Sequence, residues 1–267
     1  MSTQILHNKI VLITGASSGI GEETAKQFAA LGATVLLLAR NEERLRRVAE
    51  SIRSAGGKAE VFSLDLADLK AVVEVAERIK TGIGVPDVLI NNAGAGTWRF
   101  IEETDYQEAV DMIYVPYLAA FFLTKAFMPE MLKRNSGHIV NATSIAAKIP
   151  FAGATSYIAS RKAMIGLHEA LTADLHGTNI RTSISYFAKV DSPLWEHNPG
   201  SEERLPGAQK IIPVISAERA ARAIVKGVLL NKREIYSPFI LKVILFLTHL
   251  TPVITRYIMN RTGYKRR

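Results

Sequence analysis

Three glycines stand where an apolar run ends and a helix is expected to begin. Gly15, Gly19 and Gly21 lie in the segment IVLITGASSGIG, residues 10–21. Glycine fits a tight turn and lets a ligand approach the main chain, while the helix start offers unpaired backbone N–H groups and the positive end of its dipole. This chemistry binds phosphate. The spacing therefore predicts a dinucleotide site near residue 15, with a ligand-free glycine turn as the alternative.

The rest of the chain alternates between apolar strands and amphipathic helices. We expect strands at residues 33–39, 58–64, 88–91, 138–143, 180–187 and 234–236, and helices at 20–31, 41–55, 68–80, 104–132, 155–176 and from 216. This order is typical of an α/β fold, a doubly wound parallel sheet with helices on both faces. Ligands of such sheets bind at the carboxyl ends of the strands, where the glycine turn also lies.

Composition limits the class of protein. The chain has 267 residues, of which 48% are hydrophobic, and this is enough for one large domain with a full core. It has no cysteine, which excludes disulfides, thiolate metal sites and a cysteine nucleophile. The N-terminus shows no basic segment followed by an apolar run and a cleavage site, so we expect no signal peptide.

The positive charge is concentrated at the C-terminus. Of 33 bases and 25 acids, nine bases and one acid lie from Lys226 onward, which leaves 24 of each in the preceding body. A nucleic-acid-binding enzyme would more typically spread bases over a groove, and the tail is largely apolar as well as basic. We therefore expect no nucleic-acid partner.

Four motifs occur in a familiar order. They are TGASSGIG (residues 14–21), Asp65-Leu66, NNAG (residues 91–94), and Ser144 thirteen positions before Tyr157. In this respect the chain resembles the short-chain dehydrogenases/reductases of the Rossmann type, over roughly residues 7–237. The resemblance implies a single-domain oxidoreductase over residues 1–237, with a mobile lid at about 191–215 and a C-terminal extension at 238–267.

The resemblance also implies a nucleotide site. NAD-preferring relatives usually carry an acid at the end of the second strand, where this chain has Ala39 followed by Arg40. An arginine suits a 2′-phosphate, which favours NADP(H), although Arg40 could also belong to a solvated face with Arg44, Arg46 and Arg47. We predict no metal site. The expected cofactor contacts are Gly15, Ser17, Ser18, Gly19, Ile20, Gly21, Arg40, Asp65, Leu66, Asn91, Ala93, Gly94, Tyr157 and Arg161.

Catalysis by the family pattern needs a tyrosine that transfers a proton, a serine that hydrogen-bonds the substrate carbonyl and a lysine four residues after the tyrosine. Tyr157 and Ser144 match, but the lysine position holds Arg161, and Lys162 is displaced by one. Residues four apart share a helix face, so Arg161 is expected to face the cofactor. We hypothesise that Arg161 keeps the electrostatic role of the lysine and weakens a proton relay.

Two further positions depart from the family. Pro116 stands where the family has an asparagine within a helix, and it could break the backbone hydrogen bonding by itself or merely kink the helix. The family's Pro-Gly after the sixth strand is Phe187-Ala188 here. Beyond it, His197 in the expected lid is interpreted as a surface histidine, with a catalytic base as the alternative.

The basic tail is predicted to form two short helices, each opened by a hydroxyl residue and a proline. These pairs are Ser237-Pro238 and Thr251-Pro252, and Gly263 would end the second helix. Pro252 interrupts a run too short for a bilayer span, so we expect the helices to lie on a membrane surface. The alternative packs them over the substrate pocket or a partner subunit.

Together these features predict an NADP(H)-dependent oxidoreductase that interconverts a carbonyl and an alcohol on a large, apolar, lipid-like substrate. Within the family the chain resembles the membrane-associated lipid and ketosphinganine-reductase-like branch, through its YxxS segment and the helix at residues 166–171. The competing function is a weakened or inactive member that binds NADP(H) as a sensor or scaffold. We expect a cytoplasmic homodimer or homotetramer, peripheral on a membrane.

Overall fold

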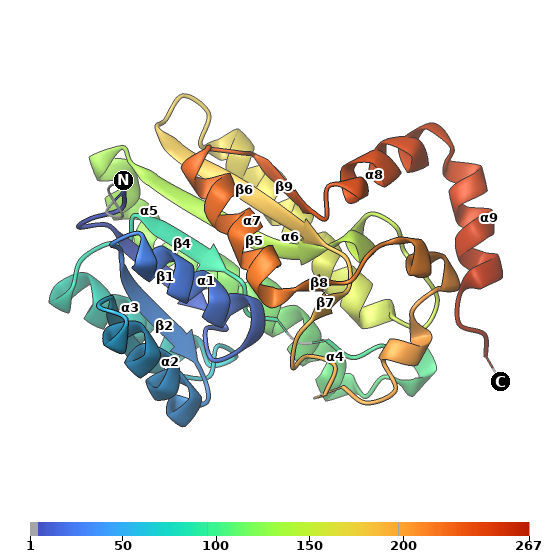
Figure 1. Ribbon diagram of the computed structural model, residues 1–267, viewed down its shortest axis with the longest axis horizontal. Coiled ribbons are helices and arrows are strands. Elements are labelled where there is room, and N and C mark those ends of the chain that lie inside the picture. The colour runs from blue at the N-terminus through green and yellow to red at the C-terminus, as the bar shows by residue number, and fades with distance from the viewer. Residues whose placement is uncertain (1–4, 95, 197, 267) are drawn as a thin grey trace.

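Seven parallel strands form the centre of the molecule in a computed structural model, which describes residues 5–94, 96–196 and 198–266 (Figure 1). The strand order is β3-β2-β1-β4-β5-β6-β9. The strands before β4 are added on one side of β1 and those from β4 onward on the other, so the order of winding switches between β1 and β4. The strands are β1 (Ile10–Thr14), β2 (Thr34–Ala39), β3 (Lys58–Ser63), β4 (Val88–Asn91), β5 (Gly137–Ser144), β6 (Ile180–Phe187) and β9 (Glu234–Ser237). The predicted doubly wound parallel sheet is confirmed.

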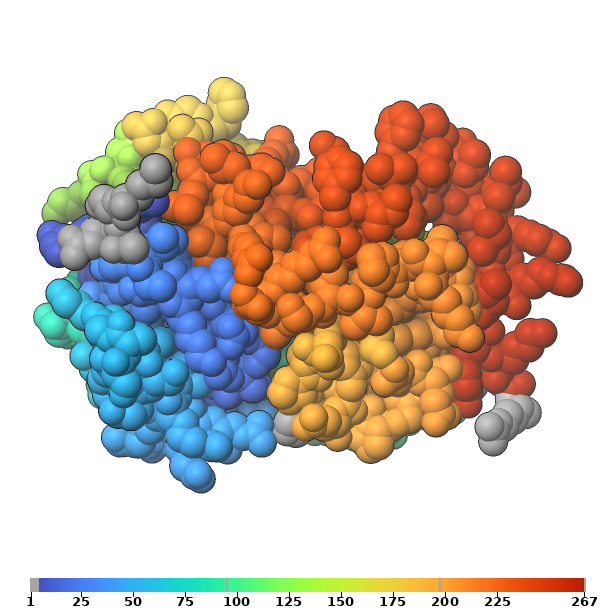
Figure 2. All heavy atoms as spheres, viewed as in Figure 1, coloured from blue at the N-terminus to red at the C-terminus, as the bar shows by residue number. Residues whose placement is uncertain are grey.

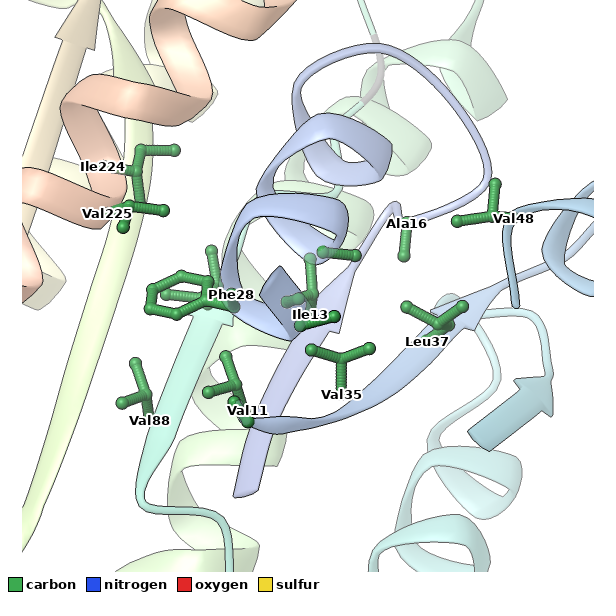
Figure 3. Packing of buried hydrophobic residues seen from close by; sticks show 14 of the residues in the cluster. Val11, Ile13, Ala16, Phe28, Val35, Leu37, Val48, Val88, Ile224 and Val225 are labelled. Atoms are coloured by element: carbon green, nitrogen blue, oxygen red, sulfur yellow. The ribbon is translucent and has the colours of Figure 1, made fainter. Parts of the chain in front are cut away.

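Helices cover both faces of this sheet. Val11 and Ile13 of β1 pack toward α1 (Gly19–Ala30), α2 (Glu42–Ser54) and α7 (Ala217–Leu229), where Phe28 and Ile224 complete the core (Figure 3). Leu12, on the opposite face of β1, belongs to the core formed with α3 (Leu69–Gly82) and α5 (Ala119–Arg134). Because both faces of the strand are buried, its sequence is apolar throughout rather than alternating.

The long helix expected at 104–132 is divided. It consists of α4 (Tyr106–Ile113), a π-helical turn (Tyr114–Leu118) and α5. The buried Pro116 lies inside the π-helical turn, and the N–H of Ala119 bonds to the carbonyl of Tyr114, five residues back. Proline lacks an N–H, so the expected break in hydrogen bonding is present at this position, in the form of a π turn.

The segment after β6 contains little regular structure. It holds the short strands β7 (Val190–Asp191) and β8 (Ile215–Ser216), which pair with each other, and two 3-10 turns at Glu202–Arg204 and Gly207–Ile211. In Figure 2 this segment, gold to orange, lies between the blue N-terminal half and the red C-terminal helices. It is therefore placed to cover the carboxyl ends of the strands.

Two helices extend from the last strand at the C-terminus, α8 (Ile240–Leu250) and α9 (Pro252–Thr262). Pro252 begins α9 as predicted, but neither helix has the expected hydroxyl cap. α8 starts two residues after Pro238, with Phe239 as its N-cap residue, because Ser237 still belongs to β9. The Thr251 hydroxyl donates back to the carbonyl of Leu247 and so does not cap α9.

Candidate active site

A cavity of about 900 Å³ lies at the carboxyl ends of the strands, where the strand order switches between β1 and β4. Three groups of residues meet in it: the glycine turn after β1, the residues around Ser144 and Tyr157, and an aromatic group from the loop after β4 and the segment after β6. α6 (Thr155–Asp174) carries Tyr157 in its first turn. Residues spread over more than 140 positions of sequence are thus brought to one site.

The glycine turn has the geometry that the sequence predicted. Gly15 and Gly19 have φ angles of +67° and +57°, a conformation that other residues rarely adopt. Both line the cavity together with Ser17, Ser18 and Ile20. Gly21 lies behind them, because a β-carbon there would overlap the carbonyl of Gly15, so it lets α1 pack closely on the turn without lining the cavity.

Arg40 and Arg44 line the end of the cavity that contains the glycine turn, beside Asn41. We call this the nucleotide end. Arg46 and Arg47, further along α2, form ion pairs with Glu42 and Glu43 and belong to the solvated face. Neither Arg40 nor Arg44 has an ion pair within the described part of the chain. Asn41 caps α2 by accepting from the N–H of Arg44, and this local turn directs both arginines to the cavity rim. The contribution of Arg44 was missed by the sequence analysis.

The two asparagines of the NNAG motif have different roles. Asn91 is buried beneath the cavity and does not line it. Its amide N–H donates to the side-chain oxygen of Asn141 at 2.9 Å. Asn92 lines the cavity and donates to the carbonyl of Thr14 at 3.1 Å, which holds the loop after β4 against the glycine turn. The motif pointed to this loop, but the sequence analysis selected Asn91 and overlooked Asn92. Ala93 and Gly94 line the cavity as predicted, as do Asp65 and Leu66 on the other side of the nucleotide end.

Ser144 and Tyr157 both line the centre of the cavity. Ser144 ends β5, and its hydroxyl accepts a hydrogen bond from the N–H of Ala146 at 3.2 Å, which fixes the side chain at the start of a 3-10 turn. Tyr157 is only 6% exposed, and its ring lies 4.6 Å from that of Trp98. The cavity therefore holds a hydroxyl and a phenol on one wall, as the family pattern requires.

Arg161 faces the same cavity, whereas Lys162 is exposed to solvent on the outside of α6. The helical phase therefore places Arg161 as predicted. The carbon at the centre of its guanidinium lies 5.0 Å from the centre of the Tyr157 ring, within the range of a cation–π contact. On its other side the guanidinium lies against Gly94. A fixed positive charge thus adjoins both the phenol and the NNAG loop.

The end of the cavity away from Arg40 is aromatic and apolar. Trp98 stacks on Trp195 with ring centres 5.0 Å apart, and Phe151 and Leu194 pack against the same group. The indole N–H of Trp195 donates to the carbonyl of Val190, so its only polar atom is satisfied. This wall suits an apolar substrate. The sequence analysis placed Trp195 in the lid but did not identify Trp98.

Three further predictions concern a metal site, His197 and the pair Phe187-Ala188. No group of three or more potential metal ligands occurs among the residues that the structure describes. His197 lies outside the described residues. Phe187 and Ala188, which replace the family's Pro-Gly, line the cavity.

The C-terminal helices border the aromatic end of the cavity. α9 contacts the 3-10 turn at Gly207–Ile211, and the ring of Tyr264 lies 6.1 Å from that of Phe100. Arg266 forms an ion pair with Glu102 at 2.9 Å. By length and composition, α8 and α9 together could also form a membrane-crossing segment bent by 113°, as could the stretch Tyr106–Arg134, whose apolar window is 39% buried inside the fold.

Large apolar side chains of these two helices are exposed. Phe246 is 63% exposed and Val253 is 67% exposed, and no part of the described chain covers them. The other members of this group, which we call the apolar hood, are Phe239, Ile240, Val243, Leu247, Leu250, Ile254, Tyr257 and Ile258. A soluble monomer rarely exposes so many apolar side chains together, so the hood marks a contact surface.

Comparison with known proteins gives a consistent result. The family model for short chain dehydrogenases matches residues 9–202. An oxidoreductase of Mycobacterium tuberculosis is 35% identical over 239 residues, covering 86% of this chain and 67% of the relative. A fatty acyl-CoA reductase of Acinetobacter baylyi is 33% identical (85% and 75% covered), and the 17-beta-hydroxysteroid dehydrogenase 13 of Mus musculus is 31% identical (89% and 76%).

Solved structures agree. A metagenomic short-chain oxidoreductase in complex with NADP is 31% identical, with a TM-score of 0.73 and coverage of 86% of this chain and 97% of that one. A short-chain dehydrogenase/reductase from Burkholderia phymatum in complex with NAD has a TM-score of 0.81 at 23% identity, with 98% of each chain covered, and supports the fold.

Proposed function

The chain belongs to the short-chain dehydrogenase family of oxidoreductases, and we propose that it uses NADP(H) to interconvert a carbonyl and an alcohol on a large apolar substrate. The observation that carries this proposal is that one cavity joins three parts. The glycine turn and two arginines lie at one end, Ser144 and Tyr157 at the centre, and an aromatic wall at the other. Each part corresponds to one component of such a reaction: nucleotide, reacting carbon and substrate chain.

The nucleotide end supports NADP(H) over NAD(H). Ala39, at the end of β2, supplies no carboxylate for the ribose hydroxyls, whereas Arg40 and Arg44 supply two guanidinium groups at the rim. Guanidinium groups match a 2′-phosphate in charge and geometry, and a carboxylate would repel it. The turn at Gly15 and Gly19 would hold the pyrophosphate through backbone N–H groups. When bound, the nicotinamide supplies or accepts the hydride.

Residues of this chain transfer the proton and hydrogen-bond the substrate oxygen. Tyr157 gives a proton to the oxygen during reduction and takes it back during oxidation, and Ser144 donates a hydrogen bond to the same oxygen. Arg161 places a positive charge beside the phenol, which stabilises the negative charge left on the tyrosine oxygen. Trp98 and Trp195 exclude water from the reacting carbon by covering the apolar end of the cavity.

A lipid-like substrate is the class that this geometry supports best. The aromatic wall is apolar apart from the indole N–H of Trp98, which has no partner among the described residues, and two relatives are named for fatty acyl-CoA and hydroxysteroid substrates. The apolar hood borders the same end of the cavity and is surrounded by bases, including Lys242, Arg256 and Arg261. Helices of this kind bind the surface of anionic membranes, so we propose that the substrate enters from a membrane on the cytoplasmic side.

The direct test follows NADPH oxidation optically with a panel of long-chain ketones and aldehydes. We expect turnover that Tyr157→Phe abolishes, because phenylalanine keeps the ring and removes the proton. Tyr106→Phe is the matched control, since Tyr106 is 93% exposed and does not line the cavity. Equal loss of activity in both variants would contradict the assigned role of Tyr157.

The second candidate is a member of the family that binds NADP(H) as a sensor or scaffold. Arg161 favours it, because an arginine holds its proton too tightly to take part in a relay, and Pro116 supplies no side-chain amide. NADPH binding without turnover of any compound in the panel would support this candidate instead.

We also propose that the chain forms a homodimer or homotetramer through its long helices. Tyr106 and Val110 of α4 and Phe121 of α5 are large, exposed and apolar on that side of the molecule. Sedimentation of the purified protein, compared with the Tyr106→Glu/Val110→Glu variant, tests this: a monomeric wild type would exclude it.

A further inference from the structure

A second hollow, of about 750 Å³, lies at the edge of the sheet, outside the cavity of the proposed reaction. It is bounded by α6, α7, the edge strand β9 and the start of α8, and it shares no lining residue with the cofactor cavity. Figure 1 shows α8 leaving the sheet directly after β9, so the hollow lies at the base of the C-terminal helices. We call it the α6–α8 hollow.

The most informative residue in this hollow is His168. The residue is only 3% exposed, and neither ring nitrogen has a hydrogen-bond partner within the described residues. Burial, followed by the charge of Arg233, lowers the pKa of His168 to about 4, so the imidazole is neutral and carries one N–H. A buried donor without a partner is costly and calls for an explanation, of which a bound ligand is one.

The rim of the hollow is basic. Lys226, Lys232, Arg233 and Lys242 are all exposed, and none of them forms an ion pair within the part of the chain that the structure describes. Two acids share the rim, Glu169 and Glu234. Glu234 is already engaged, since it accepts from the Tyr236 hydroxyl at 2.8 Å and lies 3.5 Å from the ammonium of Lys148.

The remaining lining is aromatic and joins the apolar hood. The rings of Tyr186 and Tyr236 stack with centres 5.1 Å apart, and Phe239, 71% exposed, stands beside them at the start of α8. The next exposed apolar residues of the hood are Ile240 and Val243. A ligand in the hollow therefore meets cationic groups at the rim and an apolar surface on the side of α8.

We propose that the α6–α8 hollow binds a phosphate group, carried by a lipid headgroup or by a soluble phosphate ester. The four rim bases neutralise its charge, and the imidazole N–H of His168 donates to one of its oxygens. Phosphate offers several strong acceptor oxygens and up to two negative charges, which matches a lining in which four exposed bases outnumber the two carboxylates, Glu169 and Glu234. The hood would accommodate an attached acyl chain.

The test measures binding to the full-length protein. Calorimetry with glycerol 3-phosphate probes the soluble source. Flotation with phosphatidylcholine vesicles that contain phosphatidic acid probes the lipid source, and phosphatidylcholine vesicles brought to the same surface charge with fatty acid are the control without a phosphate monoester. Binding of glycerol 3-phosphate identifies the phosphate ester itself as sufficient. Preference for phosphatidic acid without that binding identifies the headgroup.

Matched variants connect the binding to the hollow. We expect Lys226→Ala/Arg233→Ala to weaken phosphate binding by about tenfold or more. Arg219→Ala/Arg222→Ala removes the same charge from α7 outside the hollow and should leave binding unchanged. His168→Leu should weaken binding as well, and His168→Asn, which restores a donor, should recover part of it. Thermal melts establish that each variant is folded.

Two results would overturn the inference: failure of glycerol 3-phosphate to bind together with equal flotation with phosphatidic acid and fatty acid vesicles, or equal weakening of phosphate binding by the two double variants. The outcome is independent of the proposed reaction. Because the α6–α8 hollow and the cofactor cavity share no lining residue, Lys226→Ala/Arg233→Ala should oxidise NADPH with a soluble ketone at the wild-type rate. An inactive enzyme could still bind phosphate.

Discussion

The guanidinium of Arg161 occupies the space that a side chain on residue 94 would need. A β-carbon built on Gly94 overlaps the terminal nitrogens of Arg161, and the same guanidinium lies over the ring of Tyr157. An arginine at this position is longer than the family's lysine, and the absence of a side chain at Gly94 makes room for it. The conformation of Arg161 in α6 therefore depends on a glycine in the loop after β4.

Gly94→Ala should lower kcat by about 10- to 100-fold, because the added methyl group displaces Arg161 and with it the charge beside Tyr157. The shorter lysine in Gly94→Ala/Arg161→Lys should recover much of the loss. Gly166→Ala is the control on α6, since a β-carbon there meets nothing within 4 Å. A double variant no better than Gly94→Ala would show that the two residues act separately.

Arg161→Met should reduce turnover by about 100-fold, whereas Arg161→Lys should retain it or increase it. Methionine fills similar space without the charge, and lysine restores both a charge and a transferable proton. Steady-state NADPH oxidation by the three proteins checks this. If both substitutions left turnover unchanged, Arg161 would have no electrostatic role.

Arg40→Ala and Arg44→Ala should each weaken NADPH binding by about tenfold or more and leave NADH binding nearly unchanged. Only the phosphorylated nucleotide has a group for these side chains to hold. Fluorescence titration with both nucleotides measures the difference. Arg46→Ala serves as the control, because Arg46 is paired with Glu42 on the solvated side of α2.

Stability should fall as the pH is lowered from about 6.5 to 4. Burial lowers the pKa of His138 to about 4, so the unfolded chain binds a proton in this range that the native protein does not. The free energy of unfolding then decreases with falling pH, by about 3 kcal/mol for this residue at pH 4.

Denaturant titrations at several pH values test the contribution of His138. His138→Gln should remove about half of the pH dependence, because burial also lowers the pKa of His168 to about 4 and its contribution remains. The substitution also disturbs the contact between the ring and the Ser183 hydroxyl. The exposed His176 offers a control, and His176→Gln should retain the slope of the wild type. An unchanged slope in His138→Gln would assign the effect to other groups.

Phe246→Asp/Ile254→Asp should reduce binding to anionic vesicles by at least about tenfold, because each substitution removes an apolar side chain from the hood and adds a negative charge. Val73→Asp/Ile101→Asp makes the same change at two sites outside the hood, which are 46% and 69% exposed. Flotation of all three proteins measures the difference. Equal flotation would mean that the hood contacts another part of the protein or a partner subunit.

The sequence allowed the fold and one end of the site to be predicted well. Short-range rules suffice for the turn at Gly15, the capping of α2 by Asn41 and the orientation of Arg161, since each depends on residues within a few positions. The motif order then placed Ser144 and Tyr157 in the same cavity.

Other features depend on contacts between distant segments and could not be predicted in this way. Trp98 joins the site only because the segment after β6 brings Trp195 onto it, across almost a hundred residues of sequence. The contact between Gly94 and Arg161 also joins segments that are far apart in the sequence. The failed cap at Ser237 shows the same limit, since pairing with β6 extends β9 through the residue that local rules assigned to a helix start.

The end of the chain is fastened to the wall of the reaction cavity. Tyr264 packs on Phe100 and lies beneath Arg204, which pairs with Glu103, and Arg266 pairs with Glu102. Trp98 stands two residues before Phe100, so the segment that contacts the C-terminal residues also supplies a side chain of the aromatic wall. One loop therefore carries both the indole that covers Tyr157 and the ring on which the last residues of the chain pack.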